Sequence, residues 1–197
     1  MNKNIAVFAS GNGTNLQAII DNITSKKLDA NLALVVSDCK DAFALKRAKK
    51  AGINTLYADP NAFGTKQDYE KFIIGCLKKE KVGLVVLAGF MRILSPFFVR
   101  AYKKKILNIH PALLPAFKGG QAIKDAYNYG VKVTGVTVHF VDERVDHGPI
   151  IAQEAVAVSG KESVVELEKK IHKIEHRIYS ETIKKVLSAR GVFVRRR

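Results

Sequence analysis

The hydrophobic and polar positions of this chain follow two alternating periods. Short runs rich in Val, Ile and Leu predict buried strands, and the segments between them place apolar residues every three or four positions, as amphipathic helices do. Strands that alternate with helices in this way predict βαβ units and a parallel sheet covered on both faces. The predicted strands are Ile5–Ala9, Ala30–Ser37, Ile53–Tyr57, Gly83–Ala88 and Lys105–His110, and the helices between them are Thr14–Thr24, Ala42–Ala51, Lys66–Lys79 and Ser95–Tyr102.

The pattern changes in the last third of the chain. A helix is predicted near Gln121–Asn128, and the apolar/polar alternation of Val131–Val141 is typical of an antiparallel strand. Ile150–Val158 is its expected hairpin partner. A final long helix begins at the capping-box pair Ser163 and Glu166 and is expected to end at Gly191.

These elements predict one α/β domain over residues 1–197, a Rossmann-like and mostly parallel sheet with flanking helices and an antiparallel C-terminal hairpin. Residues 188–197, which end in three arginines, are expected to form a flexible basic tail. No apolar stretch reaches the roughly 20 residues of a membrane helix. The chain enters a strand without a signal-peptide cleavage region, so a cytoplasmic location is expected. Cys39 and Cys76 have no metal-ligand spacing and are expected to be reduced and buried.

The formal net charge of +15 modifies this ordinary picture. Clustered Lys and Arg would indicate nucleic-acid binding, because they supply contacts to phosphates. Here the positive residues are dispersed in pairs along the helices and no aromatic-rich basic strand accompanies them. A solvated basic surface that attracts small anionic substrates is the preferred interpretation.

The turn after the first strand is rich in glycine, and it leads directly into a helix. Backbone N–H groups at such a turn can approach an anion, and the helix N-terminus adds its positive dipole end. Leu16 stands where the dinucleotide fingerprint needs its third glycine, and the lysine of an ATP-type phosphate loop is missing. A single phosphate at Gly13, Thr14 and Asn15 is one interpretation, and a tight turn with a helix cap is the other.

Asn108 and His110 are candidates for the reacting groups. They lie two apart on one strand, so their side chains share a face, and Pro111 ends the strand at the sheet edge where ligands of α/β folds bind. An amide beside an imidazole suits acyl transfer, in which Asn stabilises the oxyanion and His moves a proton. Asp146, in the loop between the last two strands, is a carboxylate that could orient the histidine. No activated nucleophile is evident, which favours direct attack by a substrate amine.

The chain resembles the folate-dependent formyltransferases from Val7 to about Leu187, through motifs whose order and spacing match together. The motifs are Ser10-Gly11-Asn12-Gly13-Thr14-Asn15-Leu16-Gln17, Leu87-Ala88-Gly89-Phe90-Met91-Arg92-Ile93-Leu94-Ser95, Leu107-Asn108-Ile109-His110-Pro111-Ala112-Leu113-Leu114-Pro115, Val138-His139-Phe140-Val141, Asp146-His147-Gly148-Pro149-Ile150-Ile151 and Glu175-His176-Arg177-Ile178-Tyr179.

The resemblance implies that the formyl group of 10-formyltetrahydrofolate, a co-substrate, passes to the amine of phosphoribosylglycinamide in purine synthesis, without a metal. It implies a monomer or homodimer that acts on small molecules, with neither membrane nor nucleic acid as partner. The implied catalytic residues are Asn108, His110 and Asp146, with His110 as proton donor whose pKa Asp146 raises. Phosphate binding is implied for Gly13, Thr14 and Asn15, and a ribose or glycinamide contact for Glu175. The implied folate site consists of Lys66, Met91, Arg92, Ile93, Leu94 and Asn108.

Three positions depart from the family pattern. Lys66 stands where relatives often have an arginine, and it offers a point charge instead of a bidentate fork. The segment 117–122 lacks the histidines of some relatives, so no role follows for it. His147 follows Asp146 where a small residue is common, and it could alter the loop or the pKa values there.

Other motifs have alternative interpretations. His172-Lys173-Ile174-Glu175-His176 matches a zinc-protease helix pattern, but no third ligand is apparent farther along, so a substrate role for Glu175 is preferred. His139 is expected to be structural. Methionyl-tRNA, a nucleotide sugar or water are rival formyl acceptors, and a nucleotide- or RNA-binding module without catalysis is a further alternative.

Overall fold

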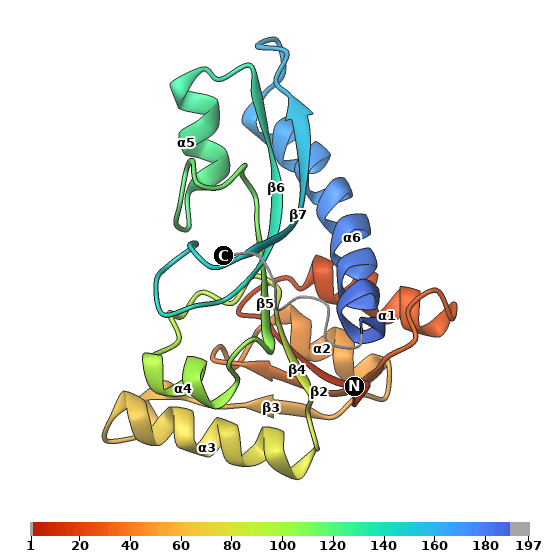
Figure 1. The fold of residues 1–197 in the computed structure, drawn as a ribbon, viewed down its shortest axis with the longest axis vertical. Helices are drawn as coiled ribbons and strands as arrows, with labels where there is room; N and C mark the ends of the chain where they lie inside the picture. The colour runs from red at the N-terminus through yellow and green to blue at the C-terminus, as the bar shows by residue number, and fades with distance from the viewer. Residues whose placement is uncertain (1, 190–197) are drawn as a thin grey trace.

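The structure is a computed structural model and describes residues 2–189. A mixed β-sheet runs through this part of the chain (Figure 1). The strand order is β3-β2-β1-β4-β5-β6-β7. Neighbours from β3 to β5 are parallel, whereas β6 is antiparallel to both β5 and β7. The strands are β1 (Asn4–Phe8), β2 (Asn31–Ser37), β3 (Thr55–Tyr57), β4 (Leu84–Leu87), β5 (Ile106–His110), β6 (Val133–Phe140) and β7 (Ile150–Ala157).

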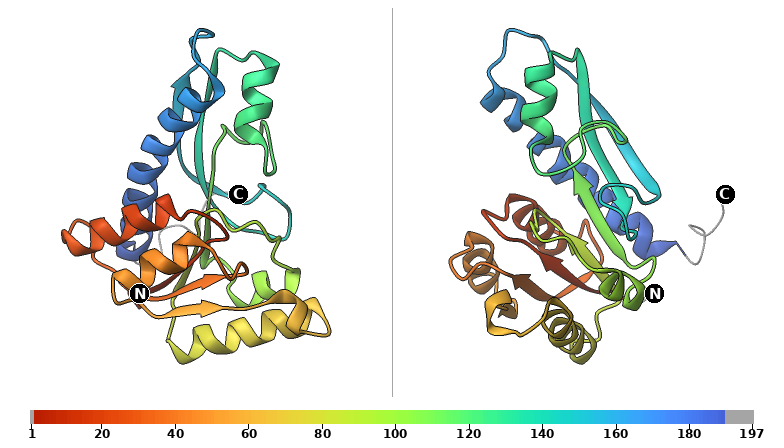
Figure 2. Two further views of the ribbon diagram at one scale, coloured as in Figure 1. Left: turned by 180° about the vertical axis from the view of Figure 1, so that it is seen from behind. Right: turned by 90° about the vertical axis from the view of Figure 1, so that its left-hand side faces the viewer.

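Helices cover both faces of the sheet. α1 (Thr14–Thr24), α2 (Phe43–Lys50) and α6 (Val164–Ser188) pack on one face, and α3 (Lys66–Lys79) and α4 (Pro96–Ala101) pack on the other (Figure 2). α5 (Ala122–Tyr129) lies beside the start of α6, where Tyr127 donates a hydrogen bond to the carbonyl of Glu162.

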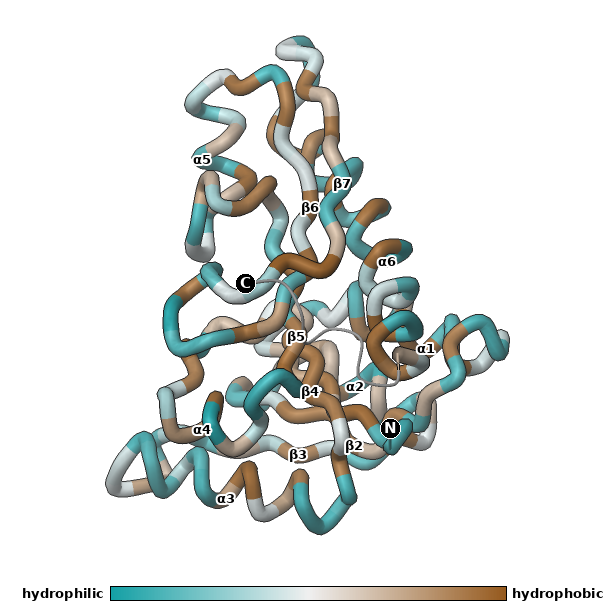
Figure 3. Tube along the Cα trace, viewed as in Figure 1, coloured by the Kyte–Doolittle hydropathy of each residue, from teal (hydrophilic) through white to brown (hydrophobic). Residues whose placement is uncertain are grey.

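The central strand β1 shows why two cores form. Ile5 and Val7 belong to the core under α1 and α6, and Ala6 and Phe8 belong to the core over α3 and α4. Successive side chains of a strand point to opposite faces, so a strand covered on both sides is apolar at every position. Apolar positions accordingly concentrate along the central strands in Figure 3.

The strand order reverses between β1 and β4. The chain leaves β1 towards β2 and β3 on one side and returns to β4 on the other. Connections that diverge from neighbouring strands leave a crevice at the carboxyl edge of the sheet, where ligands bind. The glycine-rich turn after β1, the segment 89–94 after β4 and the end of β5 all lie at this edge.

The predicted strands and helices are confirmed, with ends shifted by a residue or two. The capping box at Ser163 is also present. Among the elements of the described residues, only the short 3₁₀ helix Pro60–Ala62 was not predicted. α6 still includes Ser188, whereas Gly191 and the rest of the predicted tail, from 190 on, lie outside the described residues.

The prediction of two buried cysteines is wrong. Both thiols are free, but Cys39 is exposed and Cys76 is half-buried. Cys39 follows β2 in a turn beyond the end of the sheet, where no layer covers it.

Candidate active site

The structure brings Asn108, His110 and Asp146 together at the carboxyl end of β5. Nδ1 of His110 lies 3.4 Å from Oδ2 of Asp146, and Nδ2 of Asn108 lies 3.4 Å from Oδ1 of the same carboxylate. β5 places the first two side chains on one face, and the loop between β6 and β7 carries the carboxylate to them. The group thus combines an amide, an imidazole and a carboxylate within hydrogen-bonding or ion-pairing range.

His139, which the sequence indicated as structural, is in direct contact with this group. It faces Asn108 across the antiparallel pair β5–β6 and is 2% exposed. Its Nδ1 lies 2.9 Å from the carbonyl of Phe140, so in a neutral ring that nitrogen carries the proton and Nε2 accepts from Nδ2 of Asn108 at 3.2 Å. Both amide hydrogens of Asn108 are therefore engaged, one by His139 and one by Asp146.

Asp146 is held by its surroundings as an ionised carboxylate. Burial raises its pKa, but the Nε2–H that His139 gains when it is protonated, 3.7 Å from Oδ1, the Gly119 N–H and the nearby His110 outweigh burial and lower the carboxyl pKa below its ordinary value. The Gly119 N–H donates to Oδ2 at 2.9 Å. Asp146 has a φ of 47°, a conformation that a non-glycine residue adopts at a cost.

The loop after β5 completes the surroundings of His110. Nε2 of His110 lies 2.7 Å from the carbonyl oxygen of Phe117, while Nδ1 faces Asp146, so a proton on either nitrogen has an acceptor. Phe117 has a φ of 48°. The sequence implied no role for segment 117–122, yet Phe117 and Gly119 both contact the central group.

The glycine-rich turn is arranged to receive an anion. Gly13 caps α1 with a φ of 72° and without a side-chain hydrogen bond to the first turn, so the first backbone N–H groups of the helix stay open to a ligand. A Cβ at this position would lie 2.8 Å from Cβ of Ala44 on α2. The close approach of two backbones therefore requires glycine here.

Arg47, which sequence reasoning missed, fastens the same turn to α2. Its Nε donates to the carbonyl of Asn12 at 2.8 Å and its Nη2 to Oδ1 of Asn12 at 2.9 Å. Its Nη1 donates to Oε1 of Gln17 at 3.1 Å. The planar guanidinium can make these bonds at once because its donors are fixed in a fork.

Glu175 of α6 lies against the first turn of α1. Its side chain is 5% exposed, and its Oε2 accepts from Nδ2 of Asn15 at 3.1 Å. Nδ1 of His172 lies 2.8 Å from the same oxygen. The predicted substrate-binding residues Asn15 and Glu175 are thus in direct contact.

The segment after β4 borders the turn after β1. The backbone N–H of Met91 donates to Oγ of Ser10 at 2.9 Å, and that hydroxyl donates to Oδ1 of Asp38 at 2.6 Å. Met91 and Ile93 are 69% and 63% exposed, so both side chains are open to solvent at this edge. Of the other predicted folate residues, Arg92 lies over the Tyr69 ring, Leu94 packs against the core and Lys66 is exposed at the start of α3.

Two predicted residues lie apart from the central group. No hydrogen bond or ion pair joins Lys66 to any of the other candidates within residues 2–189. His147 turns towards Asp142, with Nδ1 2.7 Å from its Oδ2. Burial raises the pKa of Asp142, but the hydrogen bonds from His147 and the Arg144 N–H lower it overall.

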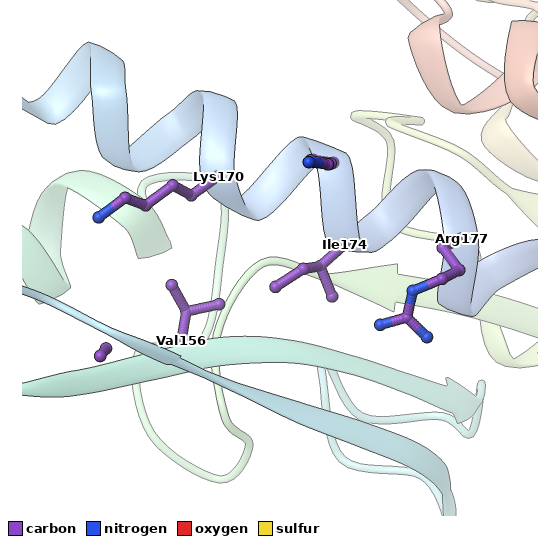
Figure 4. A pocket seen from close by; sticks show the side chains of 6 residues that line it. Val156, Lys170, Ile174 and Arg177 are labelled. Atoms are coloured by element: carbon purple, nitrogen blue, oxygen red, sulfur yellow. The ribbon is translucent and has the colours of Figure 1, made fainter.

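A hollow lies away from this group, between α6 and β7 (Figure 4). It has a volume of about 630 Å³ and contains none of the predicted site residues. Its lining consists of Val156, Ala157, Lys170, Lys173, Ile174 and Arg177.

Residues 2–189 present neither a cluster of metal-ligating side chains nor a membrane-spanning helix. No group of three or more His, Cys, Asp or Glu side chains among residues 2–189 is placed to hold a metal ion. No helix in the same range is long and apolar enough to cross a membrane.

Comparisons with known proteins agree on one family. Residues 3–183 match the family described as formyl transferase. The phosphoribosylglycinamide formyltransferase of Bacillus subtilis (strain 168) is 43% identical over 185 residues, which are 94% of this chain and 95% of that protein. The enzyme of the same name from Escherichia coli (strain K12) is 42% identical over 89% of this chain and 83% of its own. The crystal structure of the Bacillus halodurans phosphoribosylglycinamide formyltransferase superposes with a TM-score of 0.92, at 45% identity, covering 94% of this chain and 96% of that one.

Proposed function

This chain belongs to the formyl transferase family, and we propose that it transfers the formyl group of 10-formyltetrahydrofolate to the amine of phosphoribosylglycinamide. The products are formylglycinamide ribonucleotide and tetrahydrofolate, in purine synthesis. The observation that carries the proposal is the contact of His110, Asn108 and Asp146 at the same sheet edge as the glycine-rich turn at the start of α1.

The two substrates occupy neighbouring parts of this edge. Gly13, Thr14 and Asn15 hold the phosphate of the acceptor, and Glu175 contacts its ribose or glycinamide part. The exposed segment 91–94 lines the folate site with Met91, Arg92, Ile93 and Leu94, together with Asn108. Lys66 contacts the folate tail as a point charge. The bond between Met91 N–H and Ser10 supports this arrangement, because it joins the two binding segments.

The three central residues divide the chemistry. Asn108 releases one of its engaged amide hydrogens to the formyl oxygen, which becomes negative when the amine attacks the formyl carbon. His110 donates a proton to the folate nitrogen as its bond to the formyl carbon breaks, and the imidazole then takes up the proton that the attacking amine loses, which restores the donor. Asp146 orients the imidazole, because its carboxylate faces Nδ1 of the ring at 3.4 Å.

The test is an assay of tetrahydrofolate release from 10-formyltetrahydrofolate, with and without phosphoribosylglycinamide. We expect release that depends on the acceptor. We expect His110→Ala and Asp146→Asn to reduce kcat by about 10²- to 10⁴-fold, the usual contribution of a positioned proton-transfer group. Asp125→Asn, an exposed carboxylate on α5, is the matched control and should retain full activity.

Each alternative predicts a different result of the same assay. Release without acceptor would identify a hydrolase, and formylation of charged methionyl-tRNA or a nucleotide sugar would replace the acceptor. No release under any condition would favour a nucleotide- or RNA-binding module. Full activity of purified His110→Ala or Asp146→Asn would contradict the assigned roles.

A further inference from the structure

The proposed reaction uses Glu175 of the H-x-x-E-H segment but neither of its histidines, His172 and His176. His172 lies one turn before Glu175 on α6, with Nδ1 2.8 Å from Oε2 of the glutamate. The Glu175 side chain is 5% exposed, whereas that of His172 is 46% exposed. The buried carboxylate is therefore in contact with a histidine that solvent reaches and whose protonation follows the pH of the solvent.

The two oxygens of Glu175 have different surroundings. Oε2 receives both His172 and the amide of Asn15. Oε1 has no hydrogen-bond partner among residues 2–189 and stays available as an acceptor for a ligand hydroxyl or N–H. Asn15 is the second residue of α1, directly after the turn at Gly13. The free oxygen therefore belongs to a carboxylate beside the proposed phosphate site.

We propose that His172 is a positioning residue for the acceptor substrate, and that its positive charge makes binding of that substrate depend on protonation. It holds the Glu175 carboxylate by Oε2, so that Oε1 is turned towards the ligand. This inference rests on the proposed function, since it takes the acceptor to be an anionic ribonucleotide.

The charge balance explains the direction of the effect. Protonated His172 and ionised Glu175 are together neutral, whereas neutral His172 leaves a net negative charge beside the site of a phosphate. The hydrogen bond to Glu175 raises the pKa of His172, although burial acts against it. A group with a raised pKa contributes while it is protonated, so its help to binding is present at low pH and is lost as the pH rises through that pKa.

Few other titratable groups act on His172. On α6 itself they are Glu175, Glu168 and His176, whose ring stacks on that of His172 at a centroid distance of 6.5 Å. α1 presents the neutral amide of Asn15. Among the described residues of the other packed elements, β7 contributes Glu154, which is paired with Arg177, and Lys124 and Asp125 of α5 form no ion pair with α6.

The test compares the KM for phosphoribosylglycinamide of the wild type and of His172→Gln from about pH 5.5 to 8.5, the range in which histidine titrates. Glutamine keeps a donor for Glu175 but carries no charge. We expect its KM to exceed that of the wild type by about three- to five-fold at the acid end, the effect of a partly exposed charge pair, and to converge with it at the alkaline end. The kcat and the KM for the folate should not change.

Two controls separate this role from a structural one. Lys173→Gln removes an adjacent exposed charge that forms no ion pair in the described chain, and its KM should follow the wild type at every pH. His176→Gln should keep the wild-type pH dependence. The proposal would be overturned if the ratio of the KM of His172→Gln to that of the wild type stayed constant with pH. It would also be overturned if the kcat of His172→Gln fell by the same factor as its KM rises.

Equilibrium binding of phosphoribosylglycinamide, measured by calorimetry over the same pH range, does not require turnover. If the wild type binds the acceptor with the expected pH dependence but transfers no formyl group, the proposed reaction fails and the role of His172 stands. If formyl transfer proceeds and His172→Gln binds like the wild type at every pH, only the role of His172 fails. Absence of acceptor binding at every pH would overturn both.

Discussion

Oδ2 of Asp146 lies 3.4 Å from Nδ1 of His110 and also accepts the N–H of Gly119 at 2.9 Å. The other ring nitrogen of His110 meets the carbonyl of Phe117 at 2.7 Å. The segment 117–119 therefore touches both members of the pair. Asp146 and Phe117 both have positive φ, so strained backbone lies on both sides of the imidazole, and strain of this kind persists where the surrounding structure fixes the conformation.

The carboxylate of Asp146 should contribute to stability in a pH-dependent way. Because its pKa is lowered in the folded protein, its contribution is present above the unfolded value of about 3.9 and is lost as the pH falls through the lowered folded value. We expect Asp146→Asn to unfold at a lower urea concentration than the wild type near neutral pH. The difference should shrink as the pH falls below about 4. A difference in urea midpoint that stays constant with pH would show that lost packing, and not lost charge, destabilises Asp146→Asn.

Gly13→Ala should damage the phosphate turn, whereas Gly11→Ala should not. The first substitution places a Cβ 2.8 Å from Ala44 at a φ of 72°, and the second meets nothing within 4 Å. We expect Gly13→Ala to lose about 1–3 kcal/mol of stability and to raise the KM for the acceptor. Gly11→Ala should stay within about 0.5 kcal/mol of the wild type. Thermal unfolding and steady-state kinetics measure both; equal effects of the two substitutions would contradict a specific need for glycine at 13.

Arg47→Gln should weaken acceptor binding more than chemistry. The substitution removes the clamp on Asn12, whose carbonyl and side chain both accept from the guanidinium. We expect the KM for phosphoribosylglycinamide to rise about tenfold, in line with the loss of a hydrogen bond to a charged group, with little change in kcat. Lys49→Gln on the same helix removes a charge without a hydrogen bond to the turn and is the control. A fall in kcat without a rise in KM would show that the hydrogen bonds of Arg47 affect the chemical step and not acceptor binding.

Tyr179→Phe should destabilise the sheet beneath the site. The buried hydroxyl of Tyr179 on α6 lies 2.7 Å from the carbonyl of Leu87 and 3.2 Å from that of Leu107. Its removal takes a hydrogen-bond donor away from a buried carbonyl, which costs about 1–3 kcal/mol. Tyr129→Phe, at a side chain that is 81% exposed, should leave the unfolding midpoint unchanged. Equal midpoints for Tyr179→Phe and the wild type would show that the bond does not contribute.

The elements of the fold could be predicted because each carries a local signal. Continuous apolar runs mark the doubly covered strands, and Ser163 with Glu166 marks the start of α6. Asn108 and His110 were found together because residues two apart on a strand share a face. Asp146 was indicated only as a carboxylate in the loop between the last two strands, and Glu175 was found through the family motifs, since neither lies next in sequence to the residues that they contact.

Contacts between distant segments had no such signal. His139 reaches Asn108 through the register of β5 against β6, and a register is set by the whole hairpin and not by a local pattern. Arg47 looked like one more charge on a basic helix, because its partners lie in the turn after β1. The backbone N–H of Gly119 and the carbonyl of Phe117 are invisible to reasoning about side chains, so the loop that carries them received no role.

The antiparallel end of the sheet has a consequence for the order in which the protein is made. The phosphate turn follows β1, early in the chain. The strand beside β1 is β4, which pairs Leu84 with Ile5 and is made later. The carboxylate of the reacting group comes later still, with Asp146. During synthesis the anion site therefore leaves the ribosome well before the groups that could act on a bound substrate. Long-range pairing of this kind also slows folding, because distant segments must meet before their contacts stabilise them. Because Glu175 of α6 is made after Asp146, the acceptor site and the reacting group are both complete only when nearly the whole chain has left the ribosome.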